Sequence, residues 1–235
     1  MKVHVTSLTG DLRRTKTLVL VDVLRSSSTI ITALSNGAKS VIPFTNLLKA
    51  LEAHRRATLD TVLAGERHGI TPKGFDYNIS PFEMSRENVS GKTVLYSSSN
   101  LTRILGKLRA RHRILIGGVI NARAVANYLQ SRYEDVAIVA CGTKFGTAVE
   151  DLVGAGFIAA SFTHAEFSDD ALAAIGSSRA KGWMDLVKRG RVASRLIELG
   201  FEMDIDFCIS PNSSQIVPGL VGDKLVDVKQ SSRLG

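Results

Sequence analysis

One short stretch of the chain, VLVDVLRSSSTIITAL at residues 19–34, places a lone acid and an arginine in front of consecutive serines. The serines are Ser26, Ser27 and Ser28. Apolar residues around Asp22 predict a buried strand, and those after the serines recur at helical spacing. A strand-to-helix turn gathers free backbone N–H groups, hydroxyl donors and the positive end of a helix dipole, and Arg25 adds a cation that can bind an oxyanion through two hydrogen bonds. These residue types predict a cradle for phosphate or sulfonate.

A simpler interpretation of the same stretch is equally open. One serine would act only as the N-cap of the helix, which contributes ~1 kcal/mol, and Asp22 would pair with Arg25 alone. The residues of this stretch do not separate the two interpretations.

Other predicted turns carry similar side chains. The order of strand, hydroxyl-rich turn and helix returns at residues 93–108. The turn there is Ser97-Ser98-Ser99-Asn100, followed by Thr102; further turns are Gly65-Glu66-Arg67-His68 and Cys141-Gly142-Thr143-Lys144, and Glu150-Asp151 opens the next helix. Because ligands bind outside the carboxyl ends of strands in α/β sheets, we expect these turns to meet at one site.

The elements that must position these turns alternate along the chain. Strands are predicted at 18–24, 40–44, 61–64, 93–96, 113–117 and 136–140, with helices at 29–34, 47–56, 101–108, 122–130 and 148–160. This order predicts a three-layer α/β/α fold with a mostly parallel sheet and right-handed crossovers. Residues 168–199 are predicted to be helical. Residues 201–209 alternate apolar and acidic side chains, which predicts a more exposed strand.

We expect the 235 residues to form a single unit. The alternative is two similar lobes, 1–112 and 113–235, which would share a wide interface because no linker rich in Pro, Gly or Ser marks the boundary. The sequence does not determine the oligomeric state, although the size is compatible with a homodimer.

Composition narrows the function classes. The hydrophobic content of 44% indicates a globular protein. No stretch has the ~18 apolar residues of a membrane span, and the first residues lack the apolar core of a signal peptide, so a cytoplasmic protein without membrane association is expected. Cys141 and Cys208 lie far apart in sequence, which excludes a CxxC metal or redox site and predicts two buried thiols.

A formal net charge of +8 favours anionic partners. The densest basic clusters, at 109–113 and 188–191, are short and lack the interleaved aromatic residues that bind single-stranded nucleic acid. They are predicted to be solvated faces, and a small anionic ligand is expected in preference to nucleic acid.

A phosphate cradle beside acids predicts phosphoryl-transfer chemistry. Mg²⁺ needs only one or two carboxylates, with waters and substrate completing its shell. The candidate ligands are Asp22, Glu66, Glu150 and Asp151. For the adjacent pair, the alternative is that acids simply favour a helix N-terminus, by under roughly 1 kcal/mol each.

Common phosphatase signatures are mostly missing from the sequence. Asp22 lacks the second acid two residues later that an aspartyl-phosphate enzyme needs, and Thr147 stands where a cysteine phosphatase would have an arginine after Cys141. There is no Walker A sequence. Arg67-His68-Gly69 spells the RHG of histidine phosphatases but follows the third predicted strand, which favours a surface histidine over a nucleophile.

Five segments, in order, resemble one family. They are VDVLRSSSTIITALSNGAKSVIPF, AGERHG with GFDYNISPFE, GKTVLYSSSNLT, CGTKFGTAVEDLVGAG and DIDFCISPNSSQIVP, from about residue 20 to about residue 218. In these segments the chain resembles the 2-phosphosulfolactate phosphatase family, Mg²⁺-dependent enzymes associated with coenzyme M biosynthesis. The resemblance implies hydrolysis of 2-phosphosulfolactate to sulfolactate and phosphate.

The resemblance also implies roles for residues at the matching positions. The expected catalytic residues are Asp22, Arg25, Glu66 and Arg67; the expected substrate-binding residues are Ser26, Ser27, Ser28, Ser98, Ser99, Asn100, Thr102 and Lys144. Asp22 and Glu66 would hold Mg²⁺ or position the attacking water, with Glu150 or Asp151 as a further ligand. Cations for a substrate with three anionic groups would come from Arg25, Arg67, Lys73, Arg103 and Lys144.

The chain departs from the family pattern at three places. Leu101 replaces a glycine beside Asn100, Asn78-Ile79 replaces Gly-Asn before Ser80, and the order around Cys141 is Ala-Cys-Gly where the family has Cys-Ala-Gly. These departures leave open two alternatives: a phosphatase for another phosphorylated hydroxy acid, or a non-catalytic protein that binds anions or nucleic acid.

Overall fold

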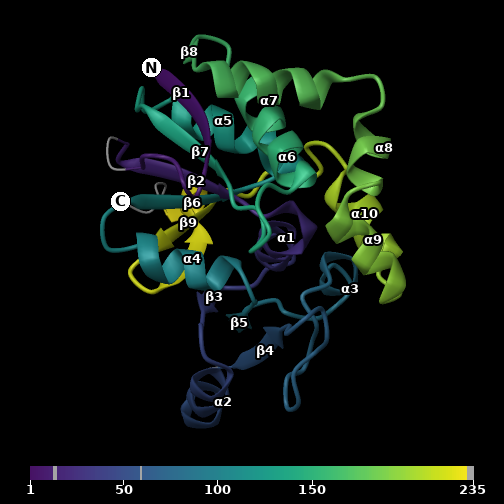
Figure 1. Cartoon of the computed structure of the whole chain (residues 1–235). Helices are drawn as coiled ribbons and strands as arrows, with labels where there is room; N and C mark the ends of the chain where they lie inside the picture. The colour runs from purple at the N-terminus through teal and green to yellow at the C-terminus, as the bar shows by residue number, and fades with distance from the viewer. Residues whose placement is uncertain (13–14, 59, 232–235) are drawn as a thin grey trace.

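The computed structural model describes residues 1–12, 15–58 and 60–231. In this part of the chain one sheet has the strand order β4-β5-β3-β10-β9-β6-β2-β7-β1-β8 (Figure 1). The strands are β1 (Lys2–Ser7), β2 (Thr17–Val21), β3 (Ser40–Pro43), β4 (Thr61–Gly65), β5 (Thr93–Ser97), β6 (Arg113–Gly117), β7 (Val136–Ala140), β8 (Glu166–Phe167), β9 (Pro218–Val221) and β10 (Lys224–Asp227).

Helices connect and cover these strands. They are α1 (Ser28–Ser35), α2 (Leu47–Arg56), α3 (Pro81–Met84), α4 (Leu101–Leu108), α5 (Ala122–Gln130), α6 (Val149–Ala160), α7 (Asp169–Arg179), α8 (Trp183–Lys188), α9 (Arg191–Glu198), α10 (Glu202–Cys208) and α11 (Val228–Ser231). Two single turns, η1 (Val23–Ser27) and η2 (Val119–Asn121), precede α1 and α5. The elements predicted between residues 17 and 160 are all present.

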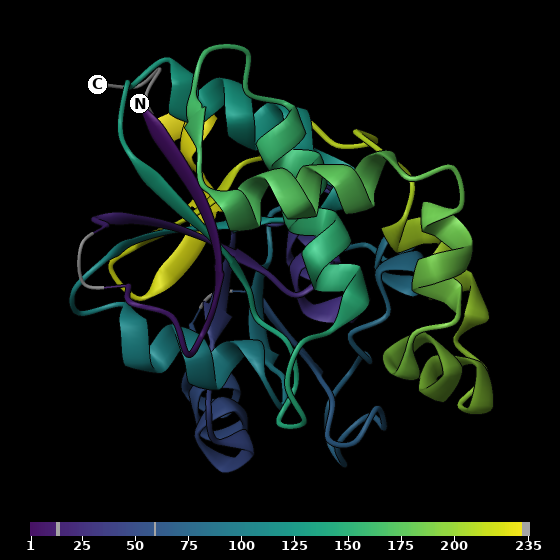
Figure 2. The ribbon, with the colours of Figure 1, turned by 45° about the horizontal axis from the view of Figure 1, so that its top comes forward.

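Two hydrophobic clusters lie on opposite faces of the sheet, because successive strand residues point to opposite sides. In β2, Val19 and Val21 belong to the cluster under α5, α6 and α7, whereas Leu18 and Leu20 belong to the cluster with α1 and α4. Figure 2 shows the helices α5–α7 gathered on one side of the strands. The predicted three-layer α/β/α fold with a mostly parallel sheet is confirmed.

The sheet contains two parallel blocks, β6-β2-β7-β1-β8 and β3-β5-β4, joined by the antiparallel hairpin β9–β10. Three antiparallel pairings separate β6 from β3, so in a flat sheet the carboxyl ends of the blocks would lie at opposite edges. Neighbouring strands rotate by roughly 20–25° each, which accumulates to roughly 100–125° over the five pairings between β5 and β2. The twist lets the carboxyl ends of both blocks border the same cavity.

The strand predicted at 201–209 is wrong, because this segment forms α10. Asp204, Ile205 and Cys208 are buried, and their spacing places them on one helical face. An alternation of acids at every second position over so short a segment does not exclude a helix. The helical segment predicted at 168–199 is divided into α7, α8 and α9, with N-caps at Gly182 and Gly190 for the last two. Strands β1, β8, β9 and β10 were not predicted.

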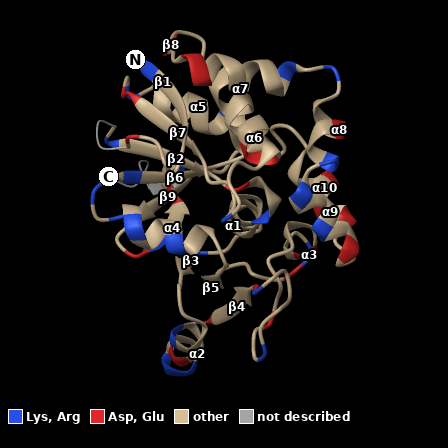
Figure 3. Cartoon of the chain, in the orientation of Figure 1, with Lys and Arg blue, Asp and Glu red and all other residues tan. Residues whose placement is uncertain are grey.

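Several coarser expectations can be compared with the described residues. Both cysteines are buried and free, as predicted. No helix of the described part is both long and apolar enough to cross a bilayer. Lys and Arg residues are distributed over several elements, α2, α4 and α9 among them (Figure 3). The division into two lobes, 1–112 and 113–235, stays a prediction. In the sheet, β2 from the first range lies between β6 and β7, which both come from the second range.

Candidate active site

A cavity of about 620 Å³ lies where the carboxyl ends of β2, β4, β5 and β7 meet. Among the predicted site residues, it is lined by Asp22, Arg25, Ser26, Glu66, Ser99, Asn100, Arg103, Lys144, Glu150 and Asp151. The remaining predicted residues, Arg67, Lys73, Ser27, Ser28, Ser98 and Thr102, are not among its lining residues. The cavity therefore brings together the turns that the sequence predicted to meet.

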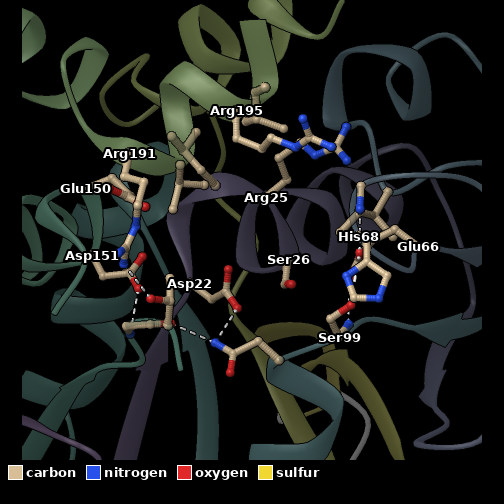
Figure 4. Close-up of a pocket in the computed structure, with 18 of the residues that line it drawn as sticks. Asp22, Arg25, Ser26, Glu66, His68, Ser99, Glu150, Asp151, Arg191 and Arg195 are labelled. Atoms are coloured by element: carbon tan, nitrogen blue, oxygen red, sulfur yellow. Dashed lines mark hydrogen bonds between the residues drawn. The ribbon is translucent and has the colours of Figure 1, made fainter. Parts of the chain in front are cut away.

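Asp22 follows β2 directly, and its side chain lies at the cavity floor, 7% exposed. Asn100 Nδ2 donates a long 3.4 Å hydrogen bond to Asp22 Oδ2 and a shorter 2.8 Å one to the Gly142 carbonyl (Figure 4). Burial raises the pKa of Asp22 from 3.8 to about 6, and the charge of Glu66 raises it further, against the donors on Asn100 and Ser26. Asp22 is therefore a buried acid whose charge is only partly compensated by its hydrogen-bond donors.

Asp151 connects two strand ends. Its Oδ1 accepts from the Val23 N–H and its Oδ2 from the Gly142 N–H, both at 2.8 Å. Burial raises the pKa of Asp151 well above its ordinary value, and the charges of Asp22 and Glu150 act in the same direction. The carboxylate thus fixes the turns after β2 and β7 against each other, and its role as a metal ligand stays a prediction.

Glu150, the first acid of the adjacent pair, borders the cavity and is 2% exposed. Burial raises its pKa to about 7, Asp22 adds to the increase, and Arg191 opposes it. The Arg191 guanidinium donates to Thr143 Oγ1 at 3.0 Å and stacks on the Phe145 ring, 4.6 Å from its centroid. Arg191 therefore fixes the 142–147 loop and places a positive charge beside the acids.

Glu66 follows β4 and lies across the cavity from Glu150 (Figure 4). Its Oε1 accepts from the Ser99 N–H at 2.5 Å, and its Oε2 accepts from the Gly69 N–H at 2.9 Å and from Ser99 Oγ at 3.1 Å. Both oxygens therefore bind the backbone of the adjoining turns.

Arg25 lies in the cavity wall with its guanidinium held from behind. Its Nη1 donates to Asp204 Oδ2 at 2.8 Å, and both side chains are 2% exposed. The guanidinium carbon lies 4.2 Å from the centroid of the Phe201 ring. The partner of Arg25 is therefore an acid from α10, not Asp22 as the simpler interpretation of the opening stretch held.

Arg67 points away from the cavity. Its guanidinium donates to the carbonyls of Glu66 and Thr45, at 2.6 and 3.3 Å, and to Ser97 Oγ at 3.0 Å. These contacts hold the turn after β4 against β5. The structure thus gives Arg67 neighbours that suit a scaffolding function, and no contact with the cavity that its predicted catalytic role would need.

The side chains of Ser27 and Ser28 form hydrogen bonds within their own turn. Ser27 Oγ accepts from the Asp22 N–H at 2.9 Å, and Ser28 Oγ donates to the Val23 carbonyl at 3.0 Å. In the second turn, Thr102 Oγ1 donates to the Ser98 carbonyl at 2.8 Å. The local interpretation therefore fits these residues, whereas Ser26 fits the cradle interpretation; Ser99 also lines the cavity, but its N–H and hydroxyl both donate to Glu66. Leu101 is fully buried in the core, so it does not fill the cavity.

Tyr96 lies beneath both serine turns. Its hydroxyl is buried and has no hydrogen-bond partner among the described residues. Burial raises its pKa beyond the ordinary value, and the charges of Asp22 and Glu66 add to the increase. The hydroxyl is therefore a neutral polar group under the floor of the cavity.

Three basic or acidic residues of the site were missed from the sequence. Arg191 and Arg195 line the cavity from α9, and Asp204 holds Arg25 from α10. Arg191 belongs to the basic cluster that was predicted to be a solvated face. His68, predicted as a surface histidine, is exposed and also lines the cavity. Two signals were available for Asp204: its helical spacing with Ile205 and Cys208, and its place as the first residue of the fifth family-like segment.

The donor set fits a hard divalent cation. No three His, Cys, Asp or Glu side chains converge as a metal cluster within the described part of the chain, but Mg²⁺ is commonly held by one or two carboxylates with waters and substrate phosphate. Asp22 and Glu150 both border the cavity, and burial raises the pKa of each. A cation between such carboxylates would offset the cost of their burial.

The family model described as 2-phosphosulpholactate phosphatase matches residues 3–223. This chain belongs to that family. Membership makes it a phosphoric monoester hydrolase and implies a small phosphorylated substrate. A protein of Thermotoga maritima named "Probable 2-phosphosulfolactate phosphatase" is 39% identical over 208 residues, 88% of this chain and 89% of that protein.

Two further relatives carry the same name. The protein of Caldanaerobacter subterraneus is 36% identical over 211 residues, covering 87% of this chain and 88% of its own length. The protein of Clostridium tetani is 35% identical over 206 residues, covering 86% and 88%. The family resemblance inferred from the five segments is thus confirmed.

Proposed function

We propose that this enzyme hydrolyses 2-phosphosulfolactate to sulfolactate and phosphate, and that the reaction depends on Mg²⁺. The observation that carries the proposal is the division of charge in the cavity. Asp22 and Ser26 lie on one side, and Arg25 and Arg195 lie on the other (Figure 4). A substrate with phosphate at one end and further anionic groups at the other matches this division, and the names of the relatives support the same substrate.

In this proposal, the residues around the floor bind and orient the phosphoryl group. Asp22 would hold Mg²⁺, with Glu150 as a further ligand, and bound Mg²⁺ supplies neutralisation of phosphoryl charge and a more acidic water. Ser26 and Asn100 offer donors to the phosphoryl oxygens. The carboxylate and sulfonate of the substrate would face Arg25 and Arg195, whereas Arg191 lies beside Glu150 and Asp151 at the phosphoryl end (Figure 4).

The setting of the reaction follows the family resemblance. We place it in coenzyme M biosynthesis, in the cytoplasm, with a homodimer as the proposed assembly. These assignments extend the proposal and are separable from the chemistry of the site.

A second candidate substrate is favoured by the apolar part of the cavity wall. This part of the wall is lined by Ile79, Val192, Leu196 and Leu199. Apolar side chains would contribute little to the binding of a sulfonate. A phosphorylated 2-hydroxy acid with an aliphatic side chain would bury apolar surface against these residues, worth roughly 25 cal/mol per Å².

The decisive experiment measures phosphate release from 2-phosphosulfolactate, phospholactate, phosphorylated 2-hydroxyisocaproate and an aryl phosphate, each with Mg²⁺ and with EDTA. Selective release from 2-phosphosulfolactate that stops in EDTA is expected. Release from the aliphatic ester alone would move the substrate to the second candidate. Release that continues in EDTA would contradict the role of Mg²⁺, and no release from any ester would contradict the proposal.

A further inference from the structure

We propose that Asp204 is a positioning residue that fixes the Arg25 guanidinium toward the substrate, which makes α10 a part of the catalytic apparatus. The inference rests on the proposed function, since it assigns a task to Arg25 in that reaction. It concerns a residue in a segment that the sequence analysis interpreted as an exposed strand.

The contact between the Arg25 and Asp204 side chains is short and shielded from solvent. Arg25 Nη1 lies 2.8 Å from Asp204 Oδ2, and each side chain is 2% exposed. An arginine buried without a partner would be strongly destabilising, so the position of its guanidinium is tied to the acid. A guanidinium has five N–H donors in a fixed plane, which leaves further donors on Arg25 after this contact.

The acid is itself held by a second region of the chain. Asp204 Oδ1 accepts from Ser80 Oγ at 2.6 Å and from the Phe82 N–H at 3.2 Å. Ser80 is the N-cap of α3, so the carboxylate is fixed at the start of that helix. The guanidinium itself is restricted by two contacts, the Asp204 carboxylate and the stacked Phe201 ring. Its orientation is therefore set before any ligand binds.

The same ion pair changes what Arg25 can contribute. Because the negative charge of Asp204 lies beside it, Arg25 adds little net positive potential to the cavity. Its contribution to ligand binding is mainly the hydrogen bonds that its remaining N–H groups donate in fixed directions. Further positive charge in the cavity comes from exposed lining residues such as Arg103 and Lys144. Removing the acid should therefore disturb the geometry of ligand binding, because a displacement of about 1 Å in a positioned group can cost about 10²-fold in rate.

The chain offers a matched control two residues away. Asp206 lies on the same helix, 60% exposed, and pairs with Lys188 at 2.7 Å. Asp204→Asn and Asp206→Asn each replace one α10 carboxylate by its isosteric amide. We expect kcat/KM for phosphate release to fall about 10²-fold in Asp204→Asn and to change less than about twofold in Asp206→Asn. An Asp204→Asn enzyme with wild-type kcat/KM would overturn the inference.

A double-mutant cycle separates positioning from general stability. Binding of sulfolactate is measured by calorimetry in wild type, Asp204→Asn, Arg25→Ala and the double variant. We expect Asp204→Asn to weaken binding about tenfold in the presence of Arg25 and to have no further effect in its absence. A further tenfold loss in the double variant would show that Asp204 acts by another route. Where Asp204→Asn alone folds poorly, the inference is still tested by comparing Arg25→Ala with the double variant, which carries neither buried charge and should bind sulfolactate equally weakly.

The wild-type enzyme distinguishes failure of this inference from failure of the proposed function. Wild-type turnover with an unaffected Asp204→Asn variant overturns the inference alone. A wild type that releases no phosphate overturns both.

Discussion

Two turns of this protein pair an acid with a nearby arginine, and the structure treats them differently. In the turn after β2, Asp22 and Arg25 both border the cavity. In the turn after β4, the carboxylate of Glu66 accepts three hydrogen bonds from adjoining turns, and Arg67 donates to two carbonyls and a serine. The residue types are the same in both turns, but the groups around them differ.

The difference teaches that local hydrogen bonds decide which charged residues are available to a ligand. An acid whose two oxygens already accept backbone N–H groups stabilises its loop. An acid such as Asp22, which borders the cavity with a long 3.4 Å hydrogen bond, can exchange that contact for a ligand at low cost. The following predictions test this contrast.

The largest expected effect comes from the two acids. Asp22→Asn should lower kcat by about 10³-fold, because it removes the charge that faces the phosphoryl site, and should leave the fold intact. Glu66→Gln should lower kcat by less than about tenfold and reduce the free energy of unfolding by about 2 kcal/mol, since an amide nitrogen cannot accept the Gly69 N–H. Steady-state kinetics and urea unfolding measure both. Equal losses of kcat in the two variants would remove the contrast.

The second-largest expected effect is that the free energy of unfolding of the metal-free enzyme depends on pH. The pKa of Asp22 is raised from 3.8 to about 6, so the folded state keeps a proton that the unfolded state has released. The free energy of unfolding should therefore fall as pH rises through this window, by up to roughly 3 kcal/mol. Asp22→Asn lacks this group and should lose less stability over the same range in urea unfolding with EDTA.

Two outcomes would contradict this prediction. One is a parallel loss of stability in wild type and Asp22→Asn between about pH 4 and about pH 8. The other is a wild type that gains stability with rising pH more steeply than the variant. Addition of Mg²⁺ at the higher pH should restore part of the lost stability, because a ligand of the folded state stabilises it.

The smallest expected effect concerns the second arginine. Arg67→Ala should keep kcat/KM within about threefold of wild type while lowering the free energy of unfolding by about 1–3 kcal/mol, because its hydrogen bonds join the β4 turn to β5. Arg25→Ala should lose far more kcat/KM than Arg67→Ala, and it should also lower the free energy of unfolding, because it leaves Asp204 buried without its partner. A large loss of kcat/KM in Arg67→Ala with unchanged stability would restore its predicted catalytic role.

The sequence was sufficient to predict the longer strands and helices between residues 17 and 160, because apolar periodicity reports local structure directly, but it did not predict the four-residue helix α3. It was insufficient for α10, where Glu202, Asp204 and Asp206 alternate as they would on a strand. The deciding facts were the burial of Asp204 against Arg25 and of Cys208 in the core, which depend on tertiary packing.

The turns were predicted to meet because the carboxyl ends of parallel strands share one edge of a sheet. This reason applies to only some of the turns. Parallel strands explain why Asp22 and Gly142 lie together, since β2 and β7 are neighbours. They do not explain Glu66 and Ser99, because the inserted β9–β10 hairpin reverses the direction of the other block. That hairpin comes from the end of the described chain, and no local pattern indicates where it inserts.

The prediction of site residues is limited for the same reason, because a local sequence pattern does not show how distant elements pack together. Arg191 stands in a short basic cluster, where nothing in the sequence separates it from Lys188, which pairs with an exposed acid. Whether a basic side chain faces solvent or a cavity depends on how α9 packs against α8 and α10.

The Arg25–Asp204 pair joins residues 179 positions apart in the chain. During synthesis at about 5–20 residues per second, roughly ten to thirty-five seconds pass between the addition of the two residues. Until α10 has been made and has docked, Arg25 has no acid to hold it. A nascent chain therefore cannot assemble this active site early, even when most of its sheet strands already exist, and catalytic competence arises only after α10 has been synthesised and has docked.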